Sequence, residues 1–315
     1  MSRLLIVDGH AVIHRAYHSI PKNLTHNGKM VNAVYGFYSM LLSSITQLTP
    51  KYVIVCLDSP GPTFRDKEYI GYRAQRKPSD PELISQFPLV QKSLEESTIP
   101  SFSIGGYEAD DIIATIAKNK APFVSKVTVI TGDKDLMQLV NAKTQLFMPV
   151  RGISQTKTFF TKDVKEKLGI YPKQVVDMKA LMGDPSDNYP GVHGIGPKTA
   201  ITLLNQYKNL DNIYKNIDKI KDSLKTKLKK DKENAYLSQK LAQLVYNVPV
   251  KFSLKRARWN ETKIQNLLKL FKTYNFKSLA SRLEKQTKPK TTRNLPKALR
   301  SSPKDEHRSN QQSLF

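Results

Sequence analysis

The chain of 315 residues has a single cysteine, Cys56, and no apolar stretch long enough to cross a membrane. One cysteine excludes a disulfide-stabilised scaffold and a zinc module built on cysteine thiolates. An Asp and a Gly directly follow the first short apolar run, and no secretory signal peptide has that pattern. We therefore expect a cytoplasmic protein that has no membrane partner.

Acidic residues are few compared with basic ones. The 51 Lys and Arg against 27 Asp and Glu give a formal net charge of +24. Such an excess predicts a polyanionic partner, and nucleic acid, the first candidate, is favoured over the second candidate, an anionic membrane surface. Residues 215–285 hold 19 basic and 6 acidic residues, whereas residues 1–170 hold 21 and 15. This distribution predicts acidic chemistry upstream and electrostatic binding downstream.

Short apolar runs alternate with helical patterns in the first half of the chain. Strands are expected at residues 4–8, 52–58 and 126–133, and helices at residues 31–48, 83–97 and 109–119. The strands are continuous Val, Ile and Leu runs, which is typical of strands buried on both faces. Strand and helix in alternation predict a parallel α/β sheet.

The second half of the chain is predicted to be helical. Helices are expected at residues 172–183, 197–207 and 262–276, the first two on either side of a Gly-rich hairpin. The last thirty residues mix Pro, Ser, Lys and Arg, which predicts a disordered basic tail. We expect an α/β core over residues 1–170, a helical domain over residues 171–285 and the tail over residues 286–315.

Carboxylates gather at the predicted strand ends, helix starts and turns. They are Asp8, Asp58, Glu108, Asp110, Asp111, Asp133, Asp135, Asp184 and Asp187. Taken one at a time, each is explained by the acidic preference of helix N-termini or by turn chemistry. Ligands of parallel sheets, however, bind outside the carboxyl ends of the strands, so these side chains are expected to converge.

A cluster of so many carboxylates requires compensating cations. All-oxygen ligand sets are preferred by Mg²⁺ or Mn²⁺, and two such ions about 4 Å apart are a standard device for phosphoryl displacement. A basic protein with an acidic pocket is therefore predicted to be a metal-dependent nuclease. A polymerase or nucleotidyl transferase would also use carboxylates, but the sequence contains no P-loop.

Five motifs, in chain order, carry a family resemblance: VDGHAVIHRAYH, FRDKEYIGYRAQR, GYEADDIIAT, TGDKDLMQL and MGDPSDNYPGVHGIGPKTA. Over residues 3–285 the chain resembles the 5′ nuclease (5′→3′ exonuclease) domain of bacterial DNA polymerase I, phage 5′ exonucleases and flap endonucleases. The resemblance implies a PIN-like α/β nuclease core with a helical arch near residues 65–100. It also implies a helix-three-turn-helix region that binds DNA.

The resemblance assigns roles to the carboxylates. A first divalent ion would be held by Asp8, Asp58, Glu108 and Asp110. A second ion would be held by Asp133, Asp135 and Asp187, with Asp111 and Asp184 as nearby or water-mediated ligands.

Basic and aromatic side chains complete the implied site. Arg15 and Arg73 would contact the scissile phosphate, with Arg76 nearby, and Tyr72 would stack on a terminal base. Arg73 departs from the commonest pattern, which has Lys there; arginine keeps the charge and adds a planar fork. The alternative is that Arg65, Arg73, Arg76 and Lys77 belong to an ordinary solvated basic helix.

The Gly-rich hairpin is expected to contact phosphates. Gly191, Gly194 and Gly196 permit positive φ and a close approach of backbone N–H groups to a phosphate. The resemblance implies that the hairpin grips the duplex backbone, with a K⁺ ion on its carbonyls and with Lys179 and Lys198 as phosphate partners. Contacts of this kind recognise backbone, so low sequence preference is expected.

Three histidines, His10, His14 and His18, lie at helical spacing and suggest zinc as an alternative. The surrounding aspartates favour hard cations instead. We therefore expect these histidines to pack against neighbours or to face solvent.

The chain ends in QQSLF, which resembles the bacterial sliding-clamp binding motif through Gln311, Leu314 and Phe315. The alternative is a chance apolar ending on a flexible tail. If the motif is real, the clamp would raise the local concentration of the protein at nicks and flaps.

These features together predict a stand-alone, monomeric 5′→3′ exonuclease and flap endonuclease with no polymerase domain. Its expected substrates are DNA 5′ ends, flaps and RNA primer–DNA hybrids in lagging-strand maturation and repair. One rival is a non-catalytic, structure-specific DNA-binding protein of the same fold. A PIN-type RNase toxin is a second rival, weakened by the helical half of the chain.

Overall fold

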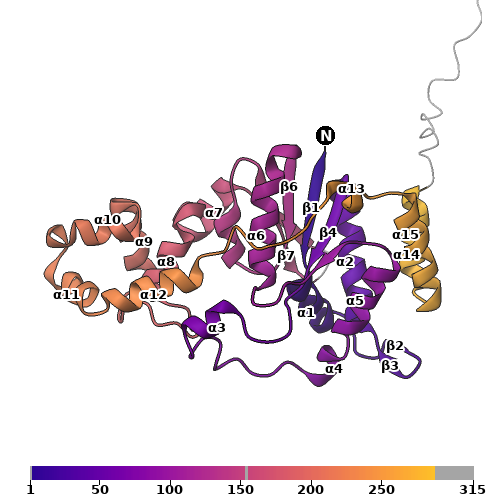
Figure 1. The fold of residues 1–315 in the computed structure, drawn as a ribbon, viewed down its shortest axis with the longest axis horizontal. Helices are drawn as coiled ribbons and strands as arrows, with labels where there is room; N and C mark the ends of the chain where they lie inside the picture. The colour runs from indigo at the N-terminus through magenta and orange to yellow at the C-terminus, as the bar shows by residue number, and fades with distance from the viewer. Residues whose placement is uncertain (1, 153–154, 288–315) are drawn as a thin grey trace, which may run out of the picture.

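The computed structural model describes residues 2–152 and 155–287, and its centre is a six-stranded sheet in the order β5-β4-β1-β6-β7-β8 (Figure 1). The strands of this sheet are β1 (Arg3–Asp8), β4 (Tyr52–Cys56), β5 (Ser101–Phe102), β6 (Lys126–Ile130), β7 (Thr144–Arg151) and β8 (Gln155–Phe159). All neighbours pair in parallel except β7 and β8, which are antiparallel. A separate two-stranded sheet joins β2 (Thr25–His26) and β3 (Lys29–Met30).

Alternate residues of β1 face two different cores. Leu5 and Val7 pack with one group of helices, and Leu4 and Ile6 with the opposite group. The first group comprises α1 (Gly9–Ser19), α2 (Asn32–Leu48), α5 (Phe87–Glu96), α14 (Glu261–Thr273) and α15 (Lys277–Thr287). The opposite face is covered by α6 (Ala109–Lys120), and its core continues into the helical half. Both faces of the sheet are therefore buried, which explains its unbroken apolar strands.

The helical half extends from one end of the sheet, and α14 and α15 lie at the other end (Figure 1). Its helices are α7 (Thr161–Leu168), α8 (Val175–Met182), α9 (Pro197–Tyr207), α10 (Leu210–Lys215), α11 (Asp222–Lys230) and α12 (Lys232–Ala242). Short 3₁₀ turns are η1 (Ala121–Phe123), η2 (Asp135–Leu139), η3 (Pro172–Gln174) and η4 (Ile217–Lys219). After α12 the chain returns along the sheet to α13 (Leu254–Ala257), where Trp259 N donates to Lys51 O at 2.9 Å.

The predicted strands are confirmed as β1, β4 and β6, although β4 ends at Cys56 and β6 at Ile130. The antiparallel pair of β7 and β8 was not predicted. The helix expected over residues 83–97 is divided into α4 (Pro81–Ile84) and α5. Pro88 accounts for the new start, because proline has no N–H and fits the first turn of a helix but not its interior.

The segment expected to form a helical arch is helical only in parts. It begins with α3 (Phe64–Glu68), continues through residues 69–80 as turns and extended chain, and then reaches α4 (Figure 1). Arg73 lies here at a φ of 54°, which interrupts any helix. Helix α5, at the end of the segment, buries Val90 and Leu94 in the core.

The C-terminal expectations fall largely outside the described residues. Helix α15 includes the first two residues of the expected tail, and the predicted clamp-binding Gln311, Leu314 and Phe315 lie beyond the described part of the chain. Within residues 2–152 and 155–287, every helix is too short or too polar to span a bilayer.

Candidate active site

Three aspartates stand at the carboxyl edge of the sheet, each at or just past a strand. Asp8 closes β1 and caps α1, accepting hydrogen bonds from Ala11 N (3.2 Å) and Thr131 Oγ1 (2.7 Å). Asp58 follows β4 and accepts a 2.7 Å bond from Ala109 N, which ties this loop to the start of α6. Asp133 follows β6. The parallel order of the strands thus brings the three side chains to one edge.

The start of α6 adds two more carboxylates to this edge, with Glu108 at the N-cap and Asp110 in the first turn. Burial raises the pKa of Asp110 well above its usual value, and the carboxylates of Asp133, Asp8, Glu108 and Asp58 raise it further. Burial likewise raises the pKa of Asp8 to about 7, with Asp58 and Asp133 adding to the rise. These five carboxylates therefore act on one another as a single negative site, which arginine from the described residues compensates only at Glu108, through Arg73 and Arg65.

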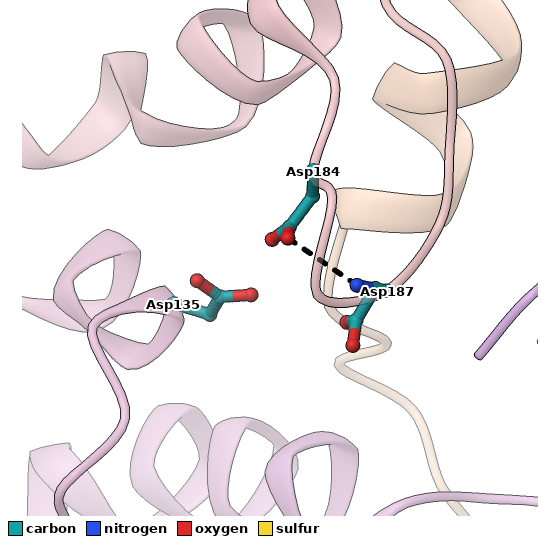
Figure 2. A group of neighbouring side chains, drawn as sticks. All are labelled: Asp135, Asp184 and Asp187. Carbon is teal, nitrogen blue, oxygen red and sulfur yellow. Dashed lines mark hydrogen bonds between the residues drawn. The ribbon is translucent and has the colours of Figure 1, made fainter. Parts of the chain in front are cut away.

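A second group of carboxylates lies beside the first. Asp135, in η2, faces Asp184 and Asp187, which belong to the turn after α8 (Figure 2). The three offer oxygen atoms that lie within 4.8 Å of one another. The turn is held by a 3.3 Å bond from Asp187 N to Asp184 Oδ1. Burial and the neighbouring Asp133 raise the pKa of Asp135 to about 6.

Lys179 supplies a positive charge to this second group. Its Nζ contacts Asp135 and lies 2.5 Å from Asp184 Oδ2. The sequence predicts Lys179 as a phosphate partner of the hairpin. Its position among the carboxylates instead favours a role in balancing their charge.

Arg73 bridges the two carboxylate groups. Its Nη1 lies 2.7 Å from Glu108 Oε1, and its Nε lies 3.3 Å from Asp187 Oδ1. Arg76 Nη2 lies 2.6 Å from the same Asp187 oxygen. The Tyr72 hydroxyl donates to Glu108 Oε1 at 3.1 Å, and Tyr72 is buried. A ring buried in this way is not available to a base, so the arrangement does not favour the predicted stacking of Tyr72, which stays a prediction.

Asp111 differs from the other predicted ligands, because both of its oxygens are fully engaged. Oδ1 accepts from Arg65 Nη2 (2.9 Å) and Val245 N (2.9 Å), and Oδ2 accepts from Arg65 Nη1 (2.7 Å) and Glu108 N (3.3 Å). A carboxylate has about four lone-pair sites, so none is left for a cation. The geometry favours a structural role for Asp111 over the predicted metal role.

A cleft of about 700 Å³ opens above the second carboxylate group. Helix α1 contributes Arg15 to its lining, and α8 contributes the apolar side chains of Met178 and Met182. Arg15 Nε donates to Gly152 O at 3.0 Å in this structure. Arg15 therefore faces the cleft in which the sequence predicts a phosphate contact.

The histidines pack as expected. His10 stacks on Phe87 with ring centroids 4.5 Å apart, and His14 contacts the same ring. His10 Nδ1 accepts a 3.0 Å hydrogen bond from Asp58 N, so this nitrogen is unprotonated and the ring is neutral. Burial also lowers the pKa of both histidines.

The Gly-rich hairpin packs tightly against the turn after α8. Gly191 has a φ of 61°, and a Cβ there would lie 2.1 Å from Gly183 N. Gly194 has a φ of 73°. Gly196, by contrast, caps α9 at a φ of −97°, so the positive φ expected there is wrong. Lys198 is exposed in the first turn of α9, where a phosphate can reach it.

The sequence did not reveal the buried role of Arg65. Its side chain is 2 % exposed and pairs with Asp111. Arginine is almost never buried without a partner, but its partner lies 46 residues away along the chain. No local pattern could have identified this pair.

A carboxylate-lined cleft at the carboxyl edge of a mainly parallel sheet, flanked by arginines and joined to a helical half, is the arrangement expected of a nuclease that uses divalent cations. Comparison with known families identifies which nuclease family this is. Residues 3–169 match the 5′-3′ exonuclease, N-terminal resolvase-like domain, and residues 170–265 match the 5′-3′ exonuclease, C-terminal SAM fold. The chain belongs to the 5′-3′ exonuclease family.

Among curated proteins, the chain is 39 % identical to DNA polymerase I of Bacillus caldotenax over 285 residues, which cover 90 % of this chain and 32 % of the relative. It is 36 % identical to DNA polymerase I of Bacillus subtilis (strain 168), covering 89 % and 32 %. The chain thus spans about a third of the length of these relatives.

Solved structures show the same fold. Zinc-bound T5 5′-exonuclease has a TM-score of 0.64 and 24 % identity, covering 90 % of this chain and 98 % of that one. The bacteriophage T5 D15 flap endonuclease, in a complex with DNA and metal ions, has a TM-score of 0.62 and 23 % identity, covering 90 % and 99 %. These likenesses confirm the predicted fold class of an α/β core followed by a helical region.

Proposed function

We propose that this chain is a cytoplasmic, monomeric 5′→3′ exonuclease and flap endonuclease. It hydrolyses phosphodiesters at DNA 5′ ends and flaps, including those of RNA primers, in lagging-strand maturation and repair. The observation that carries the proposal is the convergence of carboxylates from β1, β4, α6, β6 and the turn after α8 on one edge of the sheet. Family membership supports the reaction type.

The donor set fits two divalent cations. Every candidate ligand is a carboxylate, and hard cations such as Mg²⁺ or Mn²⁺ prefer oxygen ligands. Burial and, after it, neighbouring carboxylates raise the pKa values of Asp8, Asp110 and Asp135, and bound cations would offset that charge. We assign one ion to Asp8, Asp58, Glu108 and Asp110, and the other to Asp133, Asp135, Asp184 and Asp187. Such ions would activate water and offset charge on the phosphodiester.

The basic side chains of the site would hold the substrate. Arg73 and Arg76 are 28 % and 50 % exposed, and their guanidinium groups lie directly against the carboxylates. A phosphate is bound well by such a fork, because two parallel N–H bonds can form. Arg15 would approach the same phosphate from the α1 side of the cleft. The exposed Lys198 and the hairpin would contact the duplex backbone, with K⁺ on the hairpin carbonyls.

The proposal is tested with 5′-labelled nicked, flapped and single-stranded substrates, with and without Mg²⁺. Asp110→Ala and Asp133→Ala should abolish cleavage and leave binding to flap DNA nearly unchanged, because they remove ligands but no phosphate contact. Asp218→Asn is the matched control, since that carboxylate is 80 % exposed and lies in η4 of the helical half. Cleavage in Mg²⁺ by either alanine variant would refute the metal assignment. Binding without any cleavage by the unaltered chain would favour the non-catalytic rival.

A further inference from the structure

A second cleft, of about 750 Å³, lies on the side of the sheet where α5, α13 and α14 meet strands β4 and β5. Its lining comes from the end of α5, the edge strand β5, and the segment from Lys251 to Lys263. None of the motifs that define the carboxylate site contributes a charged side chain to it.

The charge lining this cleft is strongly positive. Four basic side chains reach it, namely Lys251, Lys255, Arg256 and Lys263. Glu95 is the one carboxylate among its lining residues in the described part of the chain. Lys263 also belongs to the first turn of α14, whose N-terminus adds positive potential.

Lys263 distinguishes the cleft from an ordinary basic surface. The residue is 5 % exposed, whereas Lys255 and Arg256 are exposed. Its Nζ donates to the carbonyl of Arg256 at 3.1 Å, and within residues 2–152 and 155–287 it forms no ion pair with a carboxylate. Burial accordingly lowers its pKa.

A buried ammonium of this kind has fewer protein partners than it has N–H donors. It carries three N–H donors, and one carbonyl satisfies only one of them. Lysine is almost never fully buried unless it is paired, because an uncompensated buried charge is costly. An anion in the cleft would supply both the missing acceptors and the missing charge.

One end of the cleft borders the carboxylate site. Leu57 and Ser103 line this end, and Ser103 Oγ donates to the carbonyl of Asp58 at 3.2 Å. From there the cleft follows β5 toward α13 and α14. Its path thus leads away from the predicted point of cleavage.

We propose that this cleft is a phosphate-binding site and that its occupant is the backbone of the DNA substrate on the side away from the helical half. This proposal rests on the proposed nuclease function. Lys263 and Arg256 would bind one phosphate, and Lys251 and Lys255 its neighbours. A free phosphate monoester, such as a 5′-mononucleotide product, offers the same chemistry from a second source.

The test measures binding of the full chain to a flapped duplex by fluorescence anisotropy across a KCl series, with EDTA present to prevent cleavage. Each lost phosphate contact reduces the slope of log affinity against log salt by about 0.9 for duplex DNA. Lys263→Gln, Lys255→Gln and Arg256→Gln should each reduce the slope by about that amount. Glu95→Gln should tighten binding. Lys143→Gln is the control, because Lys143 is exposed and lies in the loop before β7.

Free phosphate is tested separately, by the thermal shift that inorganic phosphate or a 5′-mononucleotide produces in the unaltered chain and in the Lys263→Gln variant. Smaller salt slopes in the cleft variants, with the control unchanged, support the DNA backbone as occupant. A second outcome is that the salt slopes of the cleft variants are unchanged, while phosphate stabilises the unaltered chain and does not stabilise the Lys263→Gln variant. That result would support a phosphate site that free phosphate fills. Unchanged slopes and unchanged shifts overturn the proposal.

The test still gives a result if the Lys263→Gln variant does not fold or if the chain does not cleave DNA. Lys255 and Arg256 are exposed, so their variants should fold even if Lys263→Gln does not. Binding is measured without cleavage, so the two proposals can fail separately. A chain that does not cleave DNA would refute the nuclease proposal, and the salt slopes would still show whether DNA binds in the second cleft.

Discussion

The buried pair of Arg65 and Asp111 is expected to contribute several kcal/mol to the free energy of unfolding. Besides its two bonds to Asp111, the guanidinium donates from Nε to Leu241 O (2.8 Å) and from Nη2 to Gln243 O (3.1 Å). One side chain therefore joins α3, the start of α6 and the end of α12. The perturbation that tests this arrangement is Arg65→Met.

The size of the effect follows from burial. Arg65→Met leaves the carboxylate of Asp111, which is 0 % exposed, without its counter-charge. Removing one partner of a buried pair costs about 3–5 kcal/mol. The carbonyl of Leu241 also loses its donor, a loss typically worth about 1–3 kcal/mol that overlaps with the first. We expect the free energy of unfolding to fall by at least about 3 kcal/mol.

Urea denaturation followed by circular dichroism measures this loss. The matched control is Lys240→Ala, because Lys240 and Glu68 join α12 to α3 through a 2.6 Å pair with 60 % and 40 % exposed side chains. An exposed pair contributes about 0–1 kcal/mol. The double variant Arg65→Met with Asp111→Leu should lose less than the two single losses summed. If Arg65→Met cost no more than Lys240→Ala, the reasoning would be refuted.

Three further outcomes are expected. Removing divalent ions with EDTA should abolish cleavage, and added Mg²⁺ should restore it; cleavage that persists in EDTA would contradict the metal site. Lys179→Met removes the ammonium group that competes with divalent cations for the second carboxylate group. Titration calorimetry should therefore show tighter Ca²⁺ binding, and an unchanged affinity would contradict a charge-balancing role for Lys179. Gly191→Ala should lower the free energy of unfolding by at least about 1 kcal/mol, since its φ is 61° and its Cβ would meet backbone at 2.1 Å. Gly196→Ala is the matched control, because nothing lies within 4 Å of its Cβ, and equal losses from both would disprove the packing argument.

The sequence by itself determined the fold class and the edge of the sheet at which the site lies. Continuous apolar runs predicted β1, β4 and β6, because strands buried on both faces need no polar alternation. The aspartates that follow those runs predicted a carboxylate edge, because parallel strands end on the same side. Both conclusions depend only on local patterns and on a general property of parallel sheets.

Only the tertiary structure decided what each charged side chain contacts. Asp111 and Asp110 are adjacent in sequence, yet Asp111 is saturated by Arg65 and backbone N–H groups while Asp110 faces other carboxylates. Lys179 lies between two aspartates, whereas Lys263 is buried and, in the part of the chain that the structure describes, forms no ion pair with a carboxylate. These outcomes depend on groups that are distant along the chain and meet only when the sheet, α6 and the helical half pack together. Local sequence patterns contain no information about those distances.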